Sequence, residues 1–536
     1  MNQTHWYKNA VFYQISVRAY KDSNGDGHGD LHGLTEKLDY LQALGIDCIW
    51  IMPIYPSPLK DDGYDIADYY NVDKAYGSLD DLKELLKAAH QRNIHIIMDL
   101  VLNHTSDQHA WFQSARADRN SPYRDYYVWS DTDQKYKDAR IIFVDVEPSN
   151  WTWDEQAGQY YWHRFYASQP DLNFDNLKVQ EEMTNVARFW LDLGIDGFRA
   201  DAVPYLFERE GTSCENLPET HVYLKKLRSF MDEHYPDRIL LCEANQWPED
   251  VRPYFGDDDE FHMGFHFPIM PRIYMALKKG RADDMEDILN RTPSIPENSQ
   301  WCIFLRNHDE LTLEMVTAEE RQWMWKQFAP EPRMRLNLGI RRRLAPLLDN
   351  DPQKIELAHS LLFTLPGSPI IYYGDEIGMG DNIWLSDRNG VRTPMQWNAG
   401  PTAGFSEAPT QSLYSPIIAD AVYDPFHVNV ELQQKDKSSI WSTIRHMLAT
   451  RKQHPAFGWG QFEWLNCGNK SVAAFQRTYK GERILVFHNL SPAEQSINTL
   501  RVEQPAIDLL TNESHVPENE NMALRLKPYQ YLWLKI

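Results

Sequence analysis

Short apolar runs alternate with amphipathic stretches along the N-terminal part of the chain. Such runs are typical of strands buried on both faces, and the stretches between them are typical of helices that cover those strands. The alternation predicts βα units around a parallel sheet. Eight runs qualify as strands: 10–17, 48–53, 95–102, 197–202, 239–243, 263–267, 302–307 and 369–373. Eight parallel strands predict an α/β fold, a closed (β/α)8 TIM barrel.

Three long segments interrupt this pattern. Segment 104–171 is rich in Trp and Tyr and too long for an ordinary βα loop, so we expect a separate lobe, domain B, over the barrel mouth. Segments 310–351 and 375–436 also follow strand ends, where barrel enzymes place their sites. Short alternating runs predict a C-terminal antiparallel β-sandwich domain at 455–536, which leaves 1–103 and 172–454 for the barrel.

Charge and cysteine content exclude several classes of function. The net charge of −23 argues against nucleic acid as a partner. Five scattered cysteines, without a C-x-x-C pair, indicate neither a disulfide framework nor a zinc site, which favours the cytoplasm. No apolar run reaches about 18 residues, and the N-terminus lacks a basic and then apolar leader, so we expect neither membrane insertion nor export.

Charged side chains stand at the C-terminal ends of four predicted strands. The segments are Asp99 to His104, Gly197 to Asp201, Glu243 to Asn245 and Asn307 to Asp309. Arg199 and Asp201 would project to the same side of a strand, where the cation would hold the carboxylate ionised. Taken alone, such a pair is more often an ordinary ion pair. Four polar endings favour a site, because unpaired buried charge is costly.

In this order the four segments resemble the motif set of the alpha-amylase family, glycoside hydrolase family 13. The resemblance implies a retaining mechanism with Asp201 as nucleophile, Glu243 as general acid/base and Asp309 as the carboxylate that stabilises the transition state. Retention needs two carboxyl groups about 5–5.5 Å apart, and neighbouring carboxylates push their pKa values apart, so one can stay protonated. The resemblance also implies sugar ligands in the innermost subsite: His104, Arg199 and His308.

Further substrate contacts rest on the same resemblance. Tyr64 and Asp65 resemble the family's pair that stacks on the innermost glucose and binds its hydroxyls, which implies an exo-type pocket; alone, Tyr64 would be ordinary packing. Gln169 lies in the motif form of the oligo-1,6-glucosidase branch, and so does the segment from Arg388 to Trp397. One of Arg388 and Arg392 contacts substrate, and the sequence does not decide which.

The segment 22–30 resembles the start of a calcium-binding loop. Oxygen-bearing residues at positions 1, 3, 5 and 9 and glycine at position 6 follow the EF-hand pattern, but position 12 is Gly33 instead of glutamate. The alternative is a solvated acidic turn. The predicted ligands, with His28 contributing its carbonyl, are Asp22, Asn24, Asp26, His28 and Asp30.

The family resemblance implies a second ion that ties the inserted lobe to the barrel. Both ions would be structural calcium, with magnesium as an alternative at one site, and no organic cofactor is expected. The ligands implied for the second site are Asn103, Asp171, Tyr205, Leu206 and Glu208.

Longer runs at 203–221, 243–249, 306–316 and 339–349 resemble the trehalose synthase subgroup. This implies reversible conversion of maltose to α,α-trehalose through a β-glucosyl-Asp201 intermediate, with minor hydrolysis. Asn245 and Glu310 are candidates for holding the released glucose, or equally for supporting the neighbouring carboxylates. An exo-acting α-glucosidase is the alternative. A non-enzymatic subunit would lack the carboxylates or carry a membrane anchor. A homo-oligomer and a maltokinase partner are compatible with the resemblance.

Overall fold

A computed structural model describes residues 5–502, 504–517 and 521–536. Residues 1–4, 503 and 518–520, which belong to the segments predicted as the N-terminus and the C-terminal domain, lie outside these ranges. The centre is a closed parallel barrel with strand order β1-β2-β3-β7-β8-β9-β10-β14. Its strands are β1 (Phe12–Ile15), β2 (Cys48–Ile51), β3 (His95–Val101), β7 (Gly197–Asp201), β8 (Ile239–Cys242), β9 (Met263–Phe265), β10 (Gln300–Phe304) and β14 (Ser368–Tyr372). All eight predicted strands are confirmed, and so is the fold class.

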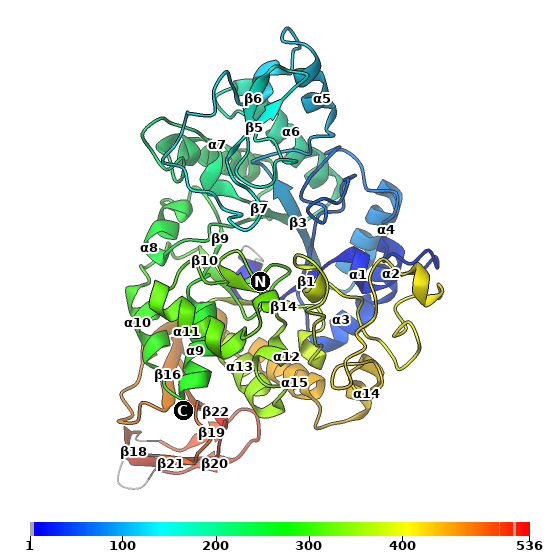
Figure 1. The fold of residues 1–536 in the computed structure, drawn as a ribbon. Helices are drawn as coiled ribbons and strands as arrows, with labels where there is room; N and C mark the ends of the chain where they lie inside the picture. Colours follow the sequence, from blue (N-terminus) through cyan, green and yellow to red (C-terminus); the bar gives the residue numbers. More distant parts are fainter. Residues whose placement is uncertain (1–4, 503, 518–520) are drawn as a thin grey trace.

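Amphipathic helices cover the barrel (Figure 1). In α4 (Leu79–His90) the Ser78 side chain and that of Asp81 form a capping box, and the buried residues Leu82, Leu85 and Leu86 recur at helical spacing. The other helices around the barrel are α1 (Val17–Tyr20), α2 (Leu31–Glu36), α3 (Leu38–Leu44), α6 (Leu177–Leu193), α7 (Pro218–His234), α8 (Pro248–Val251), α9 (Ile269–Lys279), α10 (Asp283–Arg291), α13 (Pro352–Thr364) and α15 (Ile440–Gln453). No described helix is both long and apolar enough to cross a bilayer.

The chain between β3 and β7 forms a lobe at the top of the view in Figure 1. It contains α5 (Ala110–Ala117) and an antiparallel sheet of β4 (Trp129–Ser130), β6 (Gln159–Trp162) and β5 (Trp151–Asp154). His104 and Asp171 form an antiparallel bridge, so the segment leaves the barrel and returns at one place. The segment predicted as a lobe thus begins and ends beside a polar strand end.

Two further segments follow β10 and β14. The first holds α11 (Ala318–Phe328), α12 (Leu344–Leu347) and a small sheet of β11 (Leu311–Thr312), β13 (Gly339–Ile340) and β12 (Arg335–Leu336). The second is mostly irregular and ends with α14 (Val430–Lys435). Both lie on the carboxyl side of their barrel strands, so their side chains can reach the barrel mouth.

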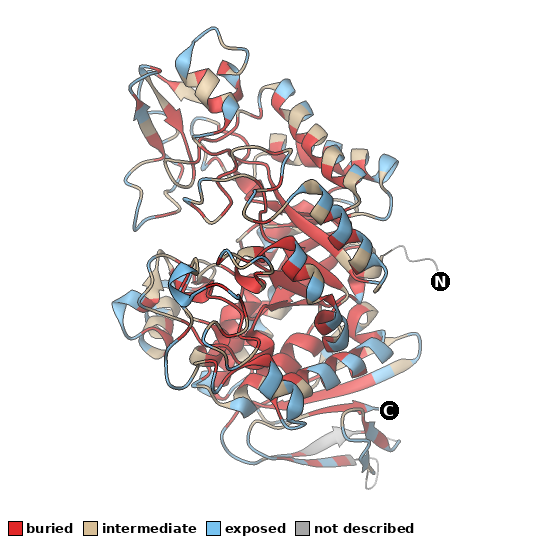
Figure 2. Cartoon of the chain, turned by 90° about the vertical axis from the view of Figure 1, so that its right-hand side faces the viewer, coloured by how far each residue is buried: buried red, intermediate tan, exposed pale blue. Residues whose placement is uncertain are grey.

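After α16 (Ala456–Trp459) the chain forms two antiparallel sheets. The larger has the order β15-β16-β17-β22-β19-β20, and the smaller pairs β18 with β21. In β17, Ile484 and Val486 belong to the barrel core, whereas Leu485 and Phe487 belong to a separate core between the sheets. This period of two explains how one sheet packs on both faces (Figure 2). The strands are β15 (Gln461–Trp464), β16 (Val472–Tyr479), β17 (Glu482–Asn489), β18 (Gln495–Arg501), β19 (Ala506–Asp508), β20 (Ser514–His515), β21 (Asn521–Leu526) and β22 (Tyr531–Lys535).

Candidate active site

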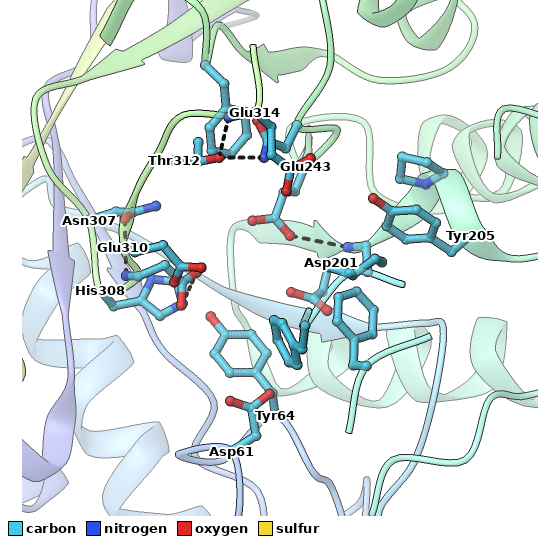
Figure 3. Close-up of a pocket in the computed structure, with 18 of the residues that line it drawn as sticks. Asp61, Tyr64, Asp201, Tyr205, Glu243, Asn307, His308, Glu310, Thr312 and Glu314 are labelled. Carbon is cyan, nitrogen blue, oxygen red and sulfur yellow. Dashed lines mark hydrogen bonds and ion pairs between the residues drawn. The ribbon is translucent and has the colours of Figure 1, made fainter. Parts of the chain in front are cut away.

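A pocket of about 870 Å³, including the space at its mouth, lies where the barrel strands end (Figure 3). Residues after the strands form its floor, the lobe supplies Phe143 and Phe165, and the segment after β10 supplies Thr312 and Glu314. Ten of the predicted catalytic and substrate-binding residues line it: Tyr64, His104, Arg199, Asp201, Glu243, Asn245, His308, Asp309, Glu310 and Arg388.

Arg199 connects the carboxylates at the floor. Its Nη1 contacts Asp99 and Asp201, and its Nη2 contacts Glu243. As the alternation predicted, Arg199 and Asp201 project to the same side of β7, and Asp99 is the register partner of Arg199 on β3. The guanidinium is 1% exposed, so these contacts are shielded from water. One buried cation therefore fixes three carboxyl groups.

The two central carboxyl groups differ in their protonation. Burial raises the pKa of Asp201 to about 6, although Arg199 opposes this. Burial raises the pKa of Glu243 to about 8, and the charges of Asp201 and Asp309 add to the effect. Near neutral pH, Asp201 is therefore ionised while Glu243 keeps its proton. This is the pairing that a nucleophile and a general acid require.

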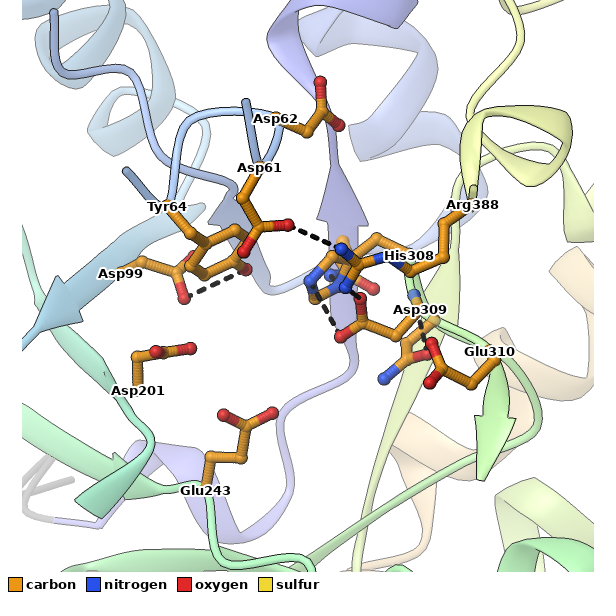
Figure 4. Close-up of polar contacts among 12 residues, drawn as sticks. Asp61, Asp62, Tyr64, Asp99, Asp201, Glu243, His308, Asp309, Glu310 and Arg388 are labelled. Carbon is orange, nitrogen blue, oxygen red and sulfur yellow. Dashed lines mark hydrogen bonds and ion pairs between the residues drawn. The ribbon is translucent and has the colours of Figure 1, made fainter. Parts of the chain in front are cut away.

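Asp309 faces these two groups from β10's side of the pocket (Figure 4). Its Oδ1 accepts from Arg388 Nη1 at 2.8 Å and from Arg392 Nη2 at 3.1 Å. Although burial opposes it, contact with the His308 ring and the charges of Arg388 and Arg392 hold the pKa of Asp309 well below its usual range. Asp309 is therefore ionised near neutral pH, which suits it to stabilising positive charge rather than to carrying a proton.

The prediction for Asp65 needs correction. Its buried carboxylate accepts from Ser57 Oγ at 2.9 Å and from the Lys60 and Asp61 amides at 2.9 and 3.0 Å, so it orders its own loop and does not line the pocket. Asp61 lines the pocket instead and pairs with Arg388. The sequence reasoning missed Asp61 because it lies in a turn, where no periodicity tells which of neighbouring carboxylates points inward.

Gln169 and Arg392 stand behind the pocket wall. Gln169 Nε2 lies 3.0 Å from Asp61 Oδ2 and 3.2 Å from His104 Nε2. Arg392 Nε donates to the His308 carbonyl at 2.8 Å. Neither is among the residues that line the pocket, whereas Arg388, the other arginine left open by the sequence, does line it.

Asp99 is a further residue without a predicted role. It is fully buried, accepts from Trp50 Nε1 at 2.7 Å and contacts Arg199. Asp99 is the only polar residue at 96–102, a run that includes most of β3. A single carboxylate in an otherwise apolar strand is the signal that could have identified it. Asp99 therefore anchors Arg199 from the strand beside β7.

The two predicted metal sites differ in how their oxygen atoms are already paired within the chain. In the 22–30 loop, Asp22 accepts from the Gly25 and Gly27 amides at 2.7 and 2.8 Å, and Asp30 caps α2 through the Gly33 amide at 2.7 Å. Within the described ranges, no group of three or more His, Cys, Asp or Glu side chains is arranged to hold an ion. Calcium at this loop stays a prediction.

At the base of the lobe, three buried oxygens have no hydrogen-bond partner among the described residues: Asn103 Oδ1, Asp171 Oδ2 and Glu208 Oε1. Burial raises the pKa of Asp171 to about 8, and burial together with Asp171 raises that of Glu208 well above its usual range. Unpaired acceptors of this kind are costly, and oxygen ligands with carboxylates suit calcium. These residues therefore fit the implied ion.

The fold and the site together define a class: a (β/α)8-barrel enzyme with carboxyl groups gathered around a buried arginine in the pocket at the carboxyl ends of its strands. The family model for the alpha amylase catalytic domain matches residues 14–329 and 341–460, and that for the maltogenic amylase C-terminal domain matches 462–533. The chain belongs to the alpha-amylase family, which confirms the resemblance seen in its motifs.

Relatives narrow the comparison. The chain is 59% identical over 507 residues to trehalose synthase/amylase TreS of Mycolicibacterium smegmatis, covering 92% of this chain and 86% of that protein. It is 54% identical to trehalose synthase of Pimelobacter sp., covering 96% and 91%. Among solved structures, isomaltulose synthase (PalI) of Klebsiella sp. has a TM-score of 0.80 at 29% identity, covering 99% of both chains.

Proposed function

We propose that this enzyme converts maltose to α,α-trehalose by intramolecular transfer of a glucosyl group. The observation that carries the proposal is the buried Arg199, which holds an ionised Asp201 and a protonated Glu243 at the floor of a pocket. Asp61 and Arg388, which both line the pocket, form an ion pair, and a pocket bounded by this pair would suit a terminal glucose. The names of relatives at 54% and 59% identity favour this substrate pair.

The reaction would use two displacements at the same carbon. Asp201 attacks C1 of the non-reducing glucose, and Glu243 gives its proton to the departing glycosidic oxygen, which leaves β-glucosyl-Asp201 and free glucose. The glucose turns within the pocket and presents its anomeric hydroxyl. Glu243 takes that proton as the oxygen attacks C1, the bond to Asp201 breaks, and α,α-trehalose forms with retention.

Keeping the released glucose in the pocket requires segments that cover the pocket. Arg140 of the lobe pairs with Glu314 at 2.7 Å and with Glu215 at 2.9 Å. The backbone N–H of Asn337 donates to the Asp145 carboxylate of the lobe at 2.7 Å. The contacts of Glu314 and Asn337 join the lobe to the segment after β10, and that of Glu215 joins it to the segment between β7 and α7. Water that is excluded here cannot compete with glucose for the intermediate.

Asn245 and Glu310 are the candidates for holding the released glucose. Asn245 Nδ2 donates to Thr312 Oγ1 at 3.1 Å, while its Oδ1 has no partner in the described part of the chain. Glu310 accepts from Asn337 Nδ2 at 3.1 Å, and both residues line the pocket.

Incubation with maltose, followed by chromatographic separation of the products, tests the proposal. Trehalose is expected as the main product, with glucose as a minor one. Glucose alone would refute intramolecular transfer and favour the exo-acting α-glucosidase.

We expect Asp145→Ala to increase the share of glucose several-fold, because the Asn337 amide loses its acceptor and the wall between lobe and barrel loosens. The ratio of glucose to trehalose at low conversion is the measurement. Asp138→Ala, at an exposed aspartate of the same lobe, is the matched control and should keep the original ratio. An unchanged ratio in Asp145→Ala would mean that this contact does not exclude water.

We also propose that Asn103, Asp171 and Glu208 hold a structural calcium ion that ties the lobe to the barrel. Removing it would leave two buried carboxyl groups without the cation that pairs with them, a loss of about 3 kcal/mol or more. A calcium chelator should therefore lower the melting temperature by several degrees, and added calcium should restore it. The double variant Asp171→Asn/Glu208→Gln should melt at a temperature insensitive to the chelator. A melting temperature of the unaltered enzyme that ignores the chelator would contradict the ion.

A further inference from the structure

His308 is held on every side. Its ring stacks on Tyr64, with the centroids 5.3 Å apart and the planes at 13°, and meets the Trp50 ring edge-on. Its Nε2 lies 3.1 Å from Asp309 Oδ2. Its Nδ1 lies 2.6 Å from the side-chain Nε2 of Gln14, which is fully buried on β1. Gln14 takes no direct part in the proposed reaction.

The hydrogen-bonding capacity of these groups allows one arrangement for a neutral ring. Asp309 is ionised and can only accept, so Nε2 of His308 must carry the hydrogen that points at it. Nδ1 then has a lone pair, and the Gln14 amide supplies the donor. In the opposite tautomer, the Nε2 lone pair would face the carboxylate. Burial, together with the cations Arg392, Arg199 and Arg388, lowers the pKa of His308 well below its usual value and so favours the neutral ring, although Asp309 opposes this.

We propose that Gln14 is a positioning residue that fixes His308 in the Nε2–H tautomer, so that this hydrogen is presented to Asp309 and to the substrate hydroxyl at the innermost subsite. The inference rests on the proposed function for its consequence in turnover. The other amide atom of Gln14, Oε1, is buried without a partner among the described residues. Leaving an acceptor unpaired is costly, which indicates that the amide is retained for its donor.

Two substitutions of Gln14 separate the effect of its hydrogen-bond donor from that of its side-chain shape. Gln14→Leu removes the donor and leaves Nδ1 unpaired. Gln14→Glu keeps the shape but offers only an acceptor, which requires a hydrogen on Nδ1 while Asp309 still requires one on Nε2, so the ring becomes an imidazolium between two carboxylates. We expect kcat for maltose to fall about tenfold or more in both variants, with a smaller change in KM.

The pH profile distinguishes the two variants. The charged or titratable groups that face His308 are Asp309, Arg392, Arg199 and Arg388, with the Tyr64 phenol on its ring face. Only Gln14→Glu adds a carboxylate to them. In that variant the acid limb of kcat/KM should move to higher pH, because His308 must lose its extra proton. Gln14→Leu should leave the limb in place.

Gln300→Leu is a matched control for the loss of a buried barrel amide. Gln300 begins β10 at the other end of the barrel, and its Nε2 donates to the Gly458 carbonyl at 2.8 Å and the Lys8 carbonyl at 3.2 Å. This variant should lower the melting temperature and keep kcat per folded enzyme.

Nitrogen-15 NMR of histidine-labelled enzyme reads the tautomer without substrate, with His308→Gln providing the assignment. The expected result is a protonated Nε2 and a bare Nδ1 in the unaltered enzyme, changed in Gln14→Glu. A protonated Nδ1 in the unaltered enzyme, or an unchanged kcat in Gln14→Leu, would overturn the inference. If maltose gives no trehalose, the proposed function fails, and the NMR result still decides the tautomer.

Discussion

Replacing Asp201 by asparagine is expected to reduce turnover of maltose by at least about 10⁴-fold, because the amide has no charge with which to attack C1. The change preserves size. Arg199 keeps its contacts with Asp99 and Glu243, so the floor of the pocket should stay in place. Maltose should therefore still bind, and the defect should appear in kcat.

Single-turnover kinetics and calorimetric titration with maltose measure the two quantities separately. Asp196→Asn is the matched control, because Asp196 is a buried aspartate just before the same strand but at its opposite end, where His90 and the Ile96 amide contact it. That variant should lose stability and keep kcat per folded enzyme. Wild-type turnover in Asp201→Asn would remove the nucleophile assignment and with it the double displacement.

The barrel and the core of the site could be predicted because both depend on local pattern. Strands such as β8 (Ile239–Cys242) are buried along their whole length, so each reads as a continuous apolar run. Arg199 and Asp201 follow from the period of two within β7. Polar residues that interrupt or end such runs need a structural or functional reason, and here they line or support the pocket at the barrel mouth.

The walls and supports could not be predicted, because they depend on contacts between distant segments. Arg140 and Glu314 are 174 positions apart, and Gln14 and His308 are 294 apart. Asp65 rests on the resemblance of Tyr64 and Asp65 to the family's pair, and the loop after β2 has no regular period, so the sequence gives no side-chain direction that would point to Asp61 instead. Gln14 did carry one signal: it is a polar residue within a fully buried strand.

Glu243→Gln should lower kcat for maltose by about 10²–10⁴-fold and remove the alkaline limb of its pH profile. In the unaltered enzyme, activity should fall below pH 6 as Asp201, whose pKa is raised to about 6, takes up a proton. Activity should also fall above pH 8 as Glu243, whose pKa is raised to about 8, loses its proton. The glutamine has no proton to lose, so only the acid limb should remain.

A substrate whose leaving group needs no proton separates the two roles of Glu243. With an aryl α-glucoside of low leaving-group pKa, Glu243→Gln should still form glucosyl-Asp201, but it lacks the base for the second step, so the intermediate should accumulate and be seen by mass spectrometry. Azide needs no base and should release the glucosyl group from Asp201 as α-glucosyl azide.

Glu249→Gln, at a half-exposed glutamate paired with Arg291 outside the pocket, is the control and should show neither effect. Full activity of Glu243→Gln on maltose would exclude Glu243 as the acid. If azide instead gave the β-anomer, the reaction would not pass through a covalent intermediate, and the closed pocket would have to retain glucose by a different route.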